Sequence, residues 1–263
     1  MKETYYMAYE KRYRAVFEAG VSRWGHSPDD PVLCETLKAW VEENRLIGKK
    51  VVEFACGEGA CGVILSRLGC IYSGYDISPS AIEKAKEALS AYPNASADVL
   101  DMVKEKAPDT YAAALDCMGF HMLVTDVDRS AYLKNAFSVL QRGAPMLLFR
   151  EAYRNGIGGE DAYKGTVSSF DEWKRITGCD YETPEPRTAH SEKGEIEVMI
   201  PLVPARARDK EDYIAEIELA GFSVENFVEM ADSNAIPCSA TIFARKRENT
   251  PDVNFEKVAE KLL

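Results

Sequence analysis

Two glycines and two aspartates, placed at predicted strand ends, are the residues whose types and spacing best predict chemistry. The short apolar run 51–54 predicts a buried parallel strand, and Gly57 and Gly59 follow it. Glycine lets the chain turn sharply and lets a ligand approach bare backbone. Asp76 and Asp98 lie at or near the ends of the next two predicted strands, where carboxylates can accept hydrogen bonds from hydroxyl and amino groups. The pattern predicts a nucleoside site, with Asp76 at a ribose and Asp98 at an adenine.

The same turn satisfies the dinucleotide-binding string G-x-G-x-x-G through Gly57, Gly59 and Gly62. In a dinucleotide site these glycines bring a helix N-terminus against a pyrophosphate, and an acid about 20 residues later binds the ribose. Asp76 comes 19 residues after Gly57, so the spacing also fits a nicotinamide cofactor. The glycine string by itself leaves an NAD(P)-dependent oxidoreductase as an alternative.

The residues around the turn separate these two interpretations. Glu53 and Cys56 complete the pattern E-x-x-C-G-x-G, which resembles the first motif of the class I S-adenosylmethionine-dependent methyltransferases. The run 77–86 after Asp76 is similar to the run D-x-S-x-x-x-I-x-x-A-[RK] that follows the second strand in that family. Asp98 falls where the family has its adenine-binding acid, with a hydrophobic neighbour after it. Agreement among these motifs favours the methyltransferase family.

The likeness covers residues 49–150, with weaker agreement over 209–247. The segment from Asp116 to Gly143 is similar to the family's D-x-x-x-x-H pattern and to the glycine-containing turn before its fifth strand. Two positions depart from the family, because Ala55 and Ala144 stand where it has glycines. Ala55 would place a methyl group where the amino-acid end of the cofactor approaches.

The resemblance implies S-adenosylmethionine as the cofactor and no metal. Asp76 would accept both ribose hydroxyls, Asp98 the adenine amino group, and Glu53 would help to bind the ammonium group. The cofactor-binding residues that it implies are Glu53, Ala55, Cys56, Gly57, Gly59, Asp76, Ile77, Asp98, Val99, Asp116 and Cys117. Related folds also transfer the aminocarboxypropyl arm of the same cofactor, and these motifs leave that alternative open.

Methyl transfer from a sulfonium is an in-line displacement, so positioning and exclusion of water supply most of the acceleration. A hydroxyl acceptor benefits from a general base, whereas an amine or thiol needs little help. His121 follows Asp116 by five residues and lies beyond the fourth predicted strand. We predict that Asp116 and His121 orient the nucleophile, with a packing role for His121 as the alternative.

Aromatic side chains in residues 1–27 recur at spacings that fit one helical stripe, which predicts a lid helix. The segment is also similar to the start of the thiopurine and tellurite-resistance methyltransferases, in which an N-terminal segment closes over the cofactor. We expect Tyr5, Tyr9, Tyr13 and Trp24 to bind the acceptor, a small neutral or cationic metabolite, because aromatic rings attract cations. Static packing of these rings on the sheet is the alternative.

Short apolar strands alternate with helices from residue 49 to 151, which predicts a doubly wound, mostly parallel α/β sheet. The family resemblance extends this to a seven-stranded, Rossmann-like sheet that ends in an antiparallel hairpin. A parallel sheet binds ligands beyond the carboxyl ends of its strands. The predicted organisation is an N-terminal helical lid over 1–48, a cofactor-binding core over 49–150, a substrate-covering insertion over 151–208, a completion of the sheet over 209–247 and a tail over 248–263.

Composition excludes several other classes. A net charge of −11 disfavours nucleic acid as a partner, because such binding draws on clustered Lys and Arg. No apolar run approaches the ~20 residues that span a bilayer, and the first residues lack a secretory signal, so we expect a cytoplasmic protein without a membrane partner. The seven cysteines include no C-x-x-C, which predicts buried thiols rather than a disulfide framework or a zinc site.

Overall fold

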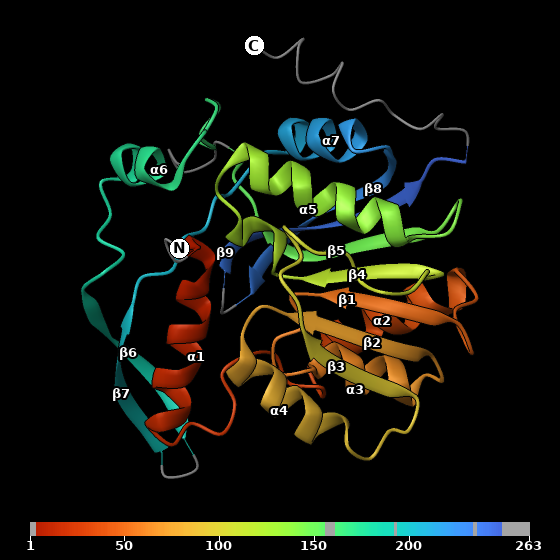
Figure 1. Cartoon of the computed structure of the whole chain (residues 1–263), viewed down its shortest axis with the longest axis horizontal. Coiled ribbons are helices and arrows are strands. Elements are labelled where there is room, and N and C mark those ends of the chain that lie inside the picture. The colour runs from red at the N-terminus through yellow and green to blue at the C-terminus, as the bar shows by residue number, and fades with distance from the viewer. Residues whose placement is uncertain (1–3, 156–160, 192–193, 234–235, 249–263) are drawn as a thin grey trace.

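The computed structural model describes residues 4–155, 161–191, 194–233 and 236–248. A seven-stranded sheet in the order β3-β2-β1-β4-β5-β9-β8 forms the centre of the molecule, and β6 and β7 form a separate two-stranded sheet (Figure 1). The strands are β1 (Lys50–Phe54), β2 (Ile71–Asp76), β3 (Ala95–Val99), β4 (Ala113–Cys117), β5 (Pro145–Ala152), β6 (Pro184–Ser191), β7 (Gly194–Pro201), β8 (Phe222–Ser233) and β9 (Ile236–Lys246). The first five strands of the large sheet are parallel, and β9 runs antiparallel to β5 and β8. The predicted doubly wound sheet with a terminal antiparallel hairpin is confirmed.

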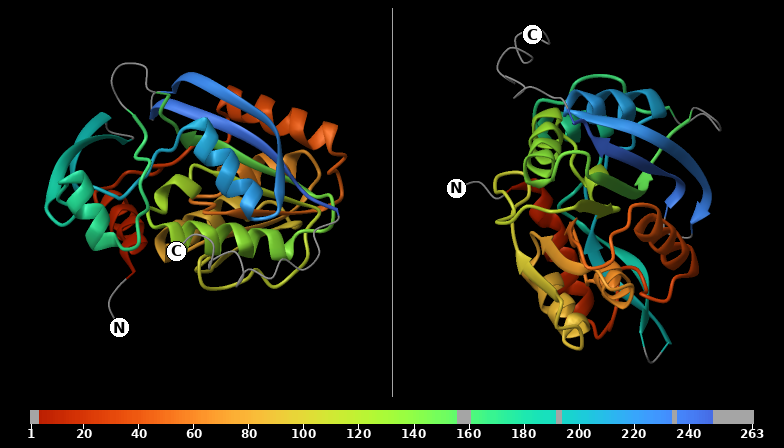
Figure 2. Two further views of the ribbon diagram at one scale, coloured as in Figure 1. Left: turned by 90° about the horizontal axis from the view of Figure 1, so that it is seen from above. Right: turned by 90° about the vertical axis from the view of Figure 1, so that its right-hand side faces the viewer.

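Helices cover both faces of the large sheet, as the two further views show (Figure 2). The helices are η1 (Tyr5–Met7), α1 (Ala8–Glu18), α2 (Pro31–Glu43), α3 (Ala60–Arg67), α4 (Pro79–Leu89), η2 (Phe120–Met122), α5 (Asp126–Val139), α6 (Phe170–Thr177) and α7 (Lys210–Leu219). Apolar side chains of α2, α3 and α4 pack on one face, and those of α5 and α7 on the other. Local sequence sets several helix starts, since Asp30 and Ser78 each accept a hydrogen bond from a backbone N–H three residues later and precede a proline.

The parallel register brings the carboxyl ends of three strands level with one another. Phe54 at the end of β1 pairs with Tyr75 of β2 and with Asp116 of β4. The turns that follow these strands therefore meet at one edge of the sheet, where a doubly wound fold binds its ligands.

The N-terminal segment and the insertion lie together beyond this edge. Helix α1 contacts α4 on one side and β7 on the other, and Figure 1 shows the β6–β7 hairpin on the outer side of α1. Helix α2 lies elsewhere, because its apolar side packs with α3 against the sheet. The predicted lid over residues 1–48 is therefore divided. Only the part before α2 lies beyond the sheet edge. The glycines at 156, 158 and 159 of the insertion, and the tail from 249, lie outside the described residues.

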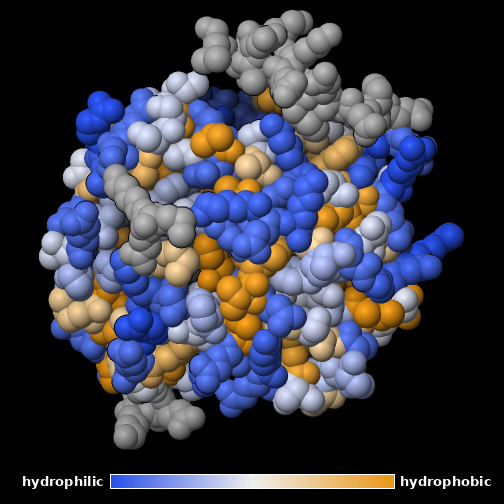
Figure 3. All heavy atoms as spheres, viewed as in Figure 1, coloured by the Kyte–Doolittle hydropathy of each residue, from blue (hydrophilic) through white to orange (hydrophobic). Residues whose placement is uncertain are grey.

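The surface is mostly hydrophilic on the face seen in Figure 3, with hydrophobic side chains gathered near its middle. Within the described ranges, no helix is both long enough and apolar enough to cross a membrane.

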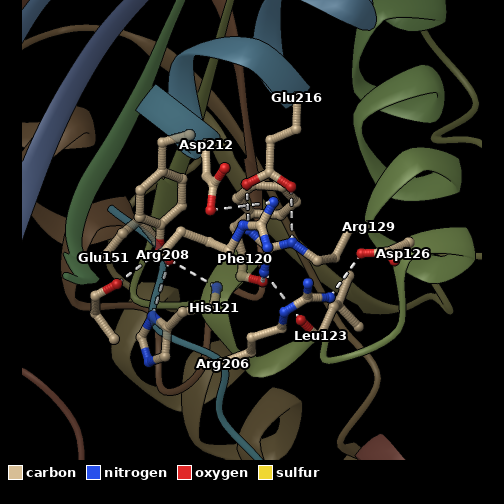
Figure 4. A network of polar contacts seen from close by, with 12 residues as sticks. Phe120, His121, Leu123, Asp126, Arg129, Glu151, Arg206, Arg208, Asp212 and Glu216 are labelled. Atoms are coloured by element: carbon tan, nitrogen blue, oxygen red, sulfur yellow. Dashed lines mark hydrogen bonds and ion pairs between the residues drawn. The ribbon is translucent and has the colours of Figure 1, made fainter. Parts of the chain in front are cut away.

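A buried ion pair joins the two helices on one face of the sheet (Figure 4). Arg129 of α5 is 1% exposed and donates to both carboxylate oxygens of Glu216 of α7, at 2.8 and 2.5 Å. The guanidinium also donates to the backbone oxygens of Phe120 and Leu123 and lies 3.9 Å from the centre of the Phe120 ring. Burial alone would lower the pKa of Arg129, but Glu216 keeps it charged by raising the pKa above its ordinary value.

We expect Glu216→Gln to lower the free energy of unfolding by ~3 kcal/mol, because it leaves a buried guanidinium without its counter-charge. Urea denaturation of the two proteins measures the difference. Glu218→Gln on the same helix is the matched control, since Glu218 lies 3.6 Å from Arg247 with both side chains more than 40% exposed; its effect should stay within about 0.5 kcal/mol. Equal losses in the two variants would contradict a special role for the buried pair.

Candidate cofactor and active site

A cavity of about 470 Å³ lies at the carboxyl ends of the parallel strands. Its floor comes from the turns after β1, β2, β3 and β4, and its roof from η1, α1 and the segment after α1. The lining residues are Tyr6, Tyr9, Arg12, Tyr13, Trp24, Gly25, His26, Glu53, Ala55, Cys56, Gly57, Glu58, Ala60, Cys61, Asp76, Ile77, Leu100, Asp101, Met102, Val103, Cys117, Met118, Gly119, Met122, Leu123 and Tyr132.

The predicted glycine turn forms the centre of the floor. Gly57 has a φ of 52°, and a Cβ at this position would lie 2.8 Å from the hydroxyl oxygen of Tyr13. A side chain there would therefore collide with the roof as well as strain the backbone. Gly59, also predicted to bind the cofactor, lies outside the lining; it caps α3 and packs against Ala85 of α4.

Asp76, at the end of β2, is buried and faces the cavity. One carboxylate oxygen accepts the N–H of Gly57 and the other the N–H of Ser78, each at 2.8 Å. A carboxylate has about four acceptor positions, so two remain for a ligand. Burial raises the pKa of Asp76, while the two N–H groups lower it in part. Ile77 lines the cavity next to it, as predicted for an apolar neighbour of the ribose.

The acid at the far end of the floor differs from the predicted one. Asp98 and its neighbour Val99 are exposed, and Asp98 pairs with Lys86 of α4 at 3.0 Å, outside the lining. The chain turns after β3 and brings Asp101 to the cavity instead, where its carboxylate accepts the hydroxyl of Tyr6 at 3.0 Å. Asp101 therefore has the position that the sequence interpretation gave to Asp98.

A group of thiols and one imidazole lies beyond the glycine turn, around Cys117 at the end of β4. Cys61 and His26 lower the pKa of the Cys117 thiol to about 5, while burial opposes this shift. The negative charge on Cys117 in turn raises the pKa of His26. Glu53 lies in the same corner and accepts the hydroxyl of Tyr72. Burial raises the pKa of Glu53 well above its ordinary range. A cation bound next to the carboxyl group would lower this pKa again.

Comparison with known proteins agrees with this geometry. Residues 51–143 match the family model described as a methyltransferase domain. The chain is 30% identical over 154 residues to a ribosomal protein L11 methyltransferase of Erwinia tasmaniensis, an alignment that covers 56% of this chain and 49% of that protein. The chain thus spans about half the length of the curated relative that it matches. Residues 51–143 form a class I methyltransferase domain. Its cofactor is S-adenosylmethionine, which overturns the nicotinamide alternative.

Solved structures show how far the fold extends. The CcbJ methyltransferase of Streptomyces caelestis superimposes with a TM-score of 0.62 at 16% identity, covering 94% of this chain and 100% of that one. An amino pentose methyltransferase of Micromonospora echinaspora with bound S-adenosylmethionine gives 0.58 at 15% identity, covering 94% and 99%. At such low sequence identities, the structural likeness shows a shared fold and nothing more. The residues of the cavity fit the cofactor, because Asp76 has acceptor positions left for a diol and Glu53 offers a buried acid for an ammonium group.

The roof of the methyltransferase cavity is fastened to the floor by carboxylates. Glu10 of α1 accepts the hydroxyls of Ser78 and Ser80 at the start of α4, at 2.6 and 2.8 Å. Glu58, in the glycine turn, accepts the N–H groups of Trp24 and Gly25, both at 2.8 Å. The N-terminal segment therefore covers part of the cavity in this structure.

Three of the four aromatic residues predicted to bind substrate, Tyr9, Tyr13 and Trp24, line the cavity. Tyr5 does not, because its ring stacks on Phe170 of α6 with the ring centres 4.8 Å apart. The described residues of the insertion contribute none of the lining. They pack instead on the outer side of α1, where the hydroxyl of Tyr9 donates to the backbone oxygen of Pro204 at 2.7 Å. The described part of the insertion thus supports the roof from outside, whereas the sequence analysis expected the insertion to cover the substrate.

Asp116 and His121, the predicted catalytic pair, are buried outside the lining (Figure 4 shows His121). Asp116 accepts the hydroxyl of Tyr132, and Tyr132 reaches the cavity. The Nδ1 atom of His121 lies 2.8 Å from Glu151 of β5. Burial lowers the pKa of His121 to about 4 and raises that of Glu151 to about 7. The structure does not bring His121 to the place where an acceptor would lie.

Sequence reasoning missed more than half of the lining residues, among them the charged or ionisable Arg12, His26, Glu58 and Asp101. Asp101 carries a weak signal, since it comes three residues after the expected acid. Arg12 also carries one, because it follows Tyr9 by three residues and precedes Tyr13, on the same helical stripe. His26 carries none, because its position depends on the path of the segment after α1.

We expect Asp76→Asn and Asp101→Asn each to weaken the binding of S-adenosylhomocysteine by about tenfold or more, because each removes a charged acceptor worth ~1.5–3 kcal/mol. Isothermal titration calorimetry measures the affinity. Asp98→Asn is the control and should bind as the parent does, since Asp98 faces solvent beside Lys86. If Asp98→Asn loses affinity for S-adenosylhomocysteine while Asp101→Asn keeps the affinity of the parent, Asp98 and not Asp101 binds the adenine.

A second prediction concerns Cys117. Because its pKa is lowered to about 5, its thiolate is already present at pH 6, and alkylation by iodoacetamide should change little between pH 6 and 8. Over the same range a free thiol such as glutathione, with a pKa of roughly 8.5, gains reactivity by tens of times. Peptide mass spectrometry measures the rate at Cys117. His26→Gln should slow the reaction at pH 6, and S-adenosylhomocysteine should protect; a rate that rises in parallel with that of glutathione would show an ordinary thiol.

Proposed function

We propose that this protein transfers the methyl group of S-adenosylmethionine to a small-molecule acceptor bound in the cavity beneath the N-terminal segment. The observation that carries the proposal is the roof, because η1, α1 and the segment to His26 cover the floor on which the cofactor would lie. A roofed cavity of about 470 Å³ lies within the range of small-molecule sites. A folded protein or a duplex nucleic acid would need the roof to leave.

When bound, the cofactor supplies an electrophilic methyl group on a sulfonium. The protein side of the reaction is positioning and exclusion of water. Asp76 and Asp101 would bind the nucleoside part, and Glu53 the ammonium group, so that three acids fix the cofactor at separate points. Tyr13, in contact with the glycine turn, and Tyr9 would keep water from the reacting end.

The acceptor would lie beneath the roof, next to Trp24, His26 and Met118, which all line the cavity. The Nε2 atom of His26 lies 2.8 Å from the sulfur of Met118, so the imidazole reaches the floor of the cavity. A neutral or cationic acceptor suits aromatic walls. We assign His26, rather than His121, to the proton of a hydroxyl acceptor, because His26 lines the cavity and His121 does not. Since Cys117 raises the pKa of His26, the imidazole becomes a base only as the pH rises through this raised value.

A protein acceptor is the second candidate, because the curated relative is named as a methyltransferase of a ribosomal protein. That relative matches only over 56% of this chain. Structural neighbours named as acting on an amino pentose or a glycopeptide match 94% and 81% of this chain, at identities of 15% and 13%, which bear on the fold alone.

A panel of metabolites tests the proposal, with release of S-adenosylhomocysteine from S-adenosylmethionine as the readout. We expect turnover on one or more small hydroxyl, amine or thiol compounds. Ribosomal protein, RNA and DNA form the opposing arm, and turnover on these alone would contradict a small-molecule acceptor. Release of 5′-methylthioadenosine in place of S-adenosylhomocysteine would show transfer of the aminocarboxypropyl arm instead.

A further inference from the structure

Arg12 places a guanidinium cation in the roof of the cavity. Its side chain lines the cavity and stacks on the ring of Trp24, with the guanidinium carbon 5.5 Å from the ring centre. The Nε atom is buried and has no hydrogen-bond acceptor. Among the residues that the structure describes, no carboxylate lies within ion-pair distance of Arg12, although 43 of the 263 residues are acidic.

This arrangement is unfavourable for the protein alone. Burial lowers the pKa of Arg12, Tyr9 and Tyr13 oppose that effect in part, and Arg187 of β6 adds like-charge repulsion. A buried polar group without a partner destabilises a fold by ~1–3 kcal/mol, and more when it is charged. A negatively charged group from a ligand would remove this cost, which points to an anion-binding position under the roof.

The position of Arg12 along the cavity indicates which anion. Its helix neighbour Tyr13 has its hydroxyl 2.8 Å from the place of a Cβ on Gly57. Trp24, on which Arg12 stacks, donates its N–H to Glu58 of the same glycine turn. Arg12 is thus tied to the glycine turn, beyond which Glu53 lies buried. A buried acid below and a guanidinium above have the charges that complement a zwitterionic α-amino acid.

We propose that Arg12 binds the α-carboxylate at the amino-acid end of the cofactor and that this contact fastens the N-terminal lid. The inference rests on the proposed function, because the roofed cavity must be the site of the cofactor. Binding of the ligand then supplies the roof with an ion pair, in addition to the hydrogen bonds that Glu10 and Glu58 already make.

Two ligands that differ at the amino-acid end test the carboxylate contact. S-adenosylhomocysteine has the zwitterionic end, and 5′-methylthioadenosine replaces it with a methyl group. In titration calorimetry, Arg12→Gln should bind S-adenosylhomocysteine about 10- to 100-fold more weakly than the parent, but bind 5′-methylthioadenosine within about twofold of the parent. Arg14→Gln is the matched control, since Arg14 is 65% exposed and pairs only loosely with Glu18, at 3.7 Å.

The outcomes are separable. Unchanged affinity of Arg12→Gln for S-adenosylhomocysteine would overturn the inference, and so would an equal loss for both ligands, which would indicate a damaged roof. Failure of the parent to bind either ligand would overturn the proposed function itself. Hydrogen exchange supplies the second readout: S-adenosylhomocysteine should slow exchange over residues 5–18 more than 5′-methylthioadenosine does, and Arg12→Gln should abolish the difference. Equal protection from hydrogen exchange by both ligands in the parent would overturn the inference that the Arg12 contact fastens the lid.

Discussion

The level ends of β1, β2 and β4 are the constraint on which the site depends. Phe54, Tyr75 and Asp116 are paired across the three strands, so the turns after them open side by side. A shift of β1 by one residue would move its side chains to the opposite face of the sheet. Glu53 would then leave the corner that it shares with Tyr72, and the glycine turn would no longer face Asp76. Packing of apolar helices on both faces fixes this register.

The contacts that close the roof use the same turns as the predicted cofactor contacts. Glu58 belongs to the glycine turn, Ser78 donates a backbone N–H to Asp76, and Asp101 accepts the hydroxyl of Tyr6. A ligand that orders these turns would therefore also order the N-terminal segment, because both interactions depend on the same backbone positions. A ligand can shift the equilibrium between the open and closed states only if it binds the closed state more tightly than the open one. Arg12 is the roof side chain placed to provide that differential affinity.

The sequence predicted the parts of the site that are local in the chain. The strand, the glycine turn and Asp76 are fixed by residues close together in sequence, so their spacing was sufficient. Asp98 illustrates the limit, because β3 is an edge strand whose end exposes this side chain, and a turn three residues later brings Asp101 inward. His26 and the outer position of the insertion depend on contacts between distant segments, for which no local periodicity exists. The packing of β7 on α1 is one such contact.

The backbone is strained directly after two of the strands that end at the site. Ala55 and Met118, which follow β1 and β4, have φ angles of 54° and 63°, in the left-handed region that costs non-glycine residues roughly 1–2 kcal/mol each. Both residues line the cavity. A Cβ on Gly119 would lie 2.4 Å from the Cβ of Ala55, so the glycine makes room for a methyl group where the family usually has none. Strain persists only where the surroundings enforce it. Here two of the strained residues, Ala55 and Met118, lie in the turns that line the cavity next to Glu53, so the proposed amino-acid end of the cofactor would bind against backbone that the surrounding structure holds in an unfavourable conformation.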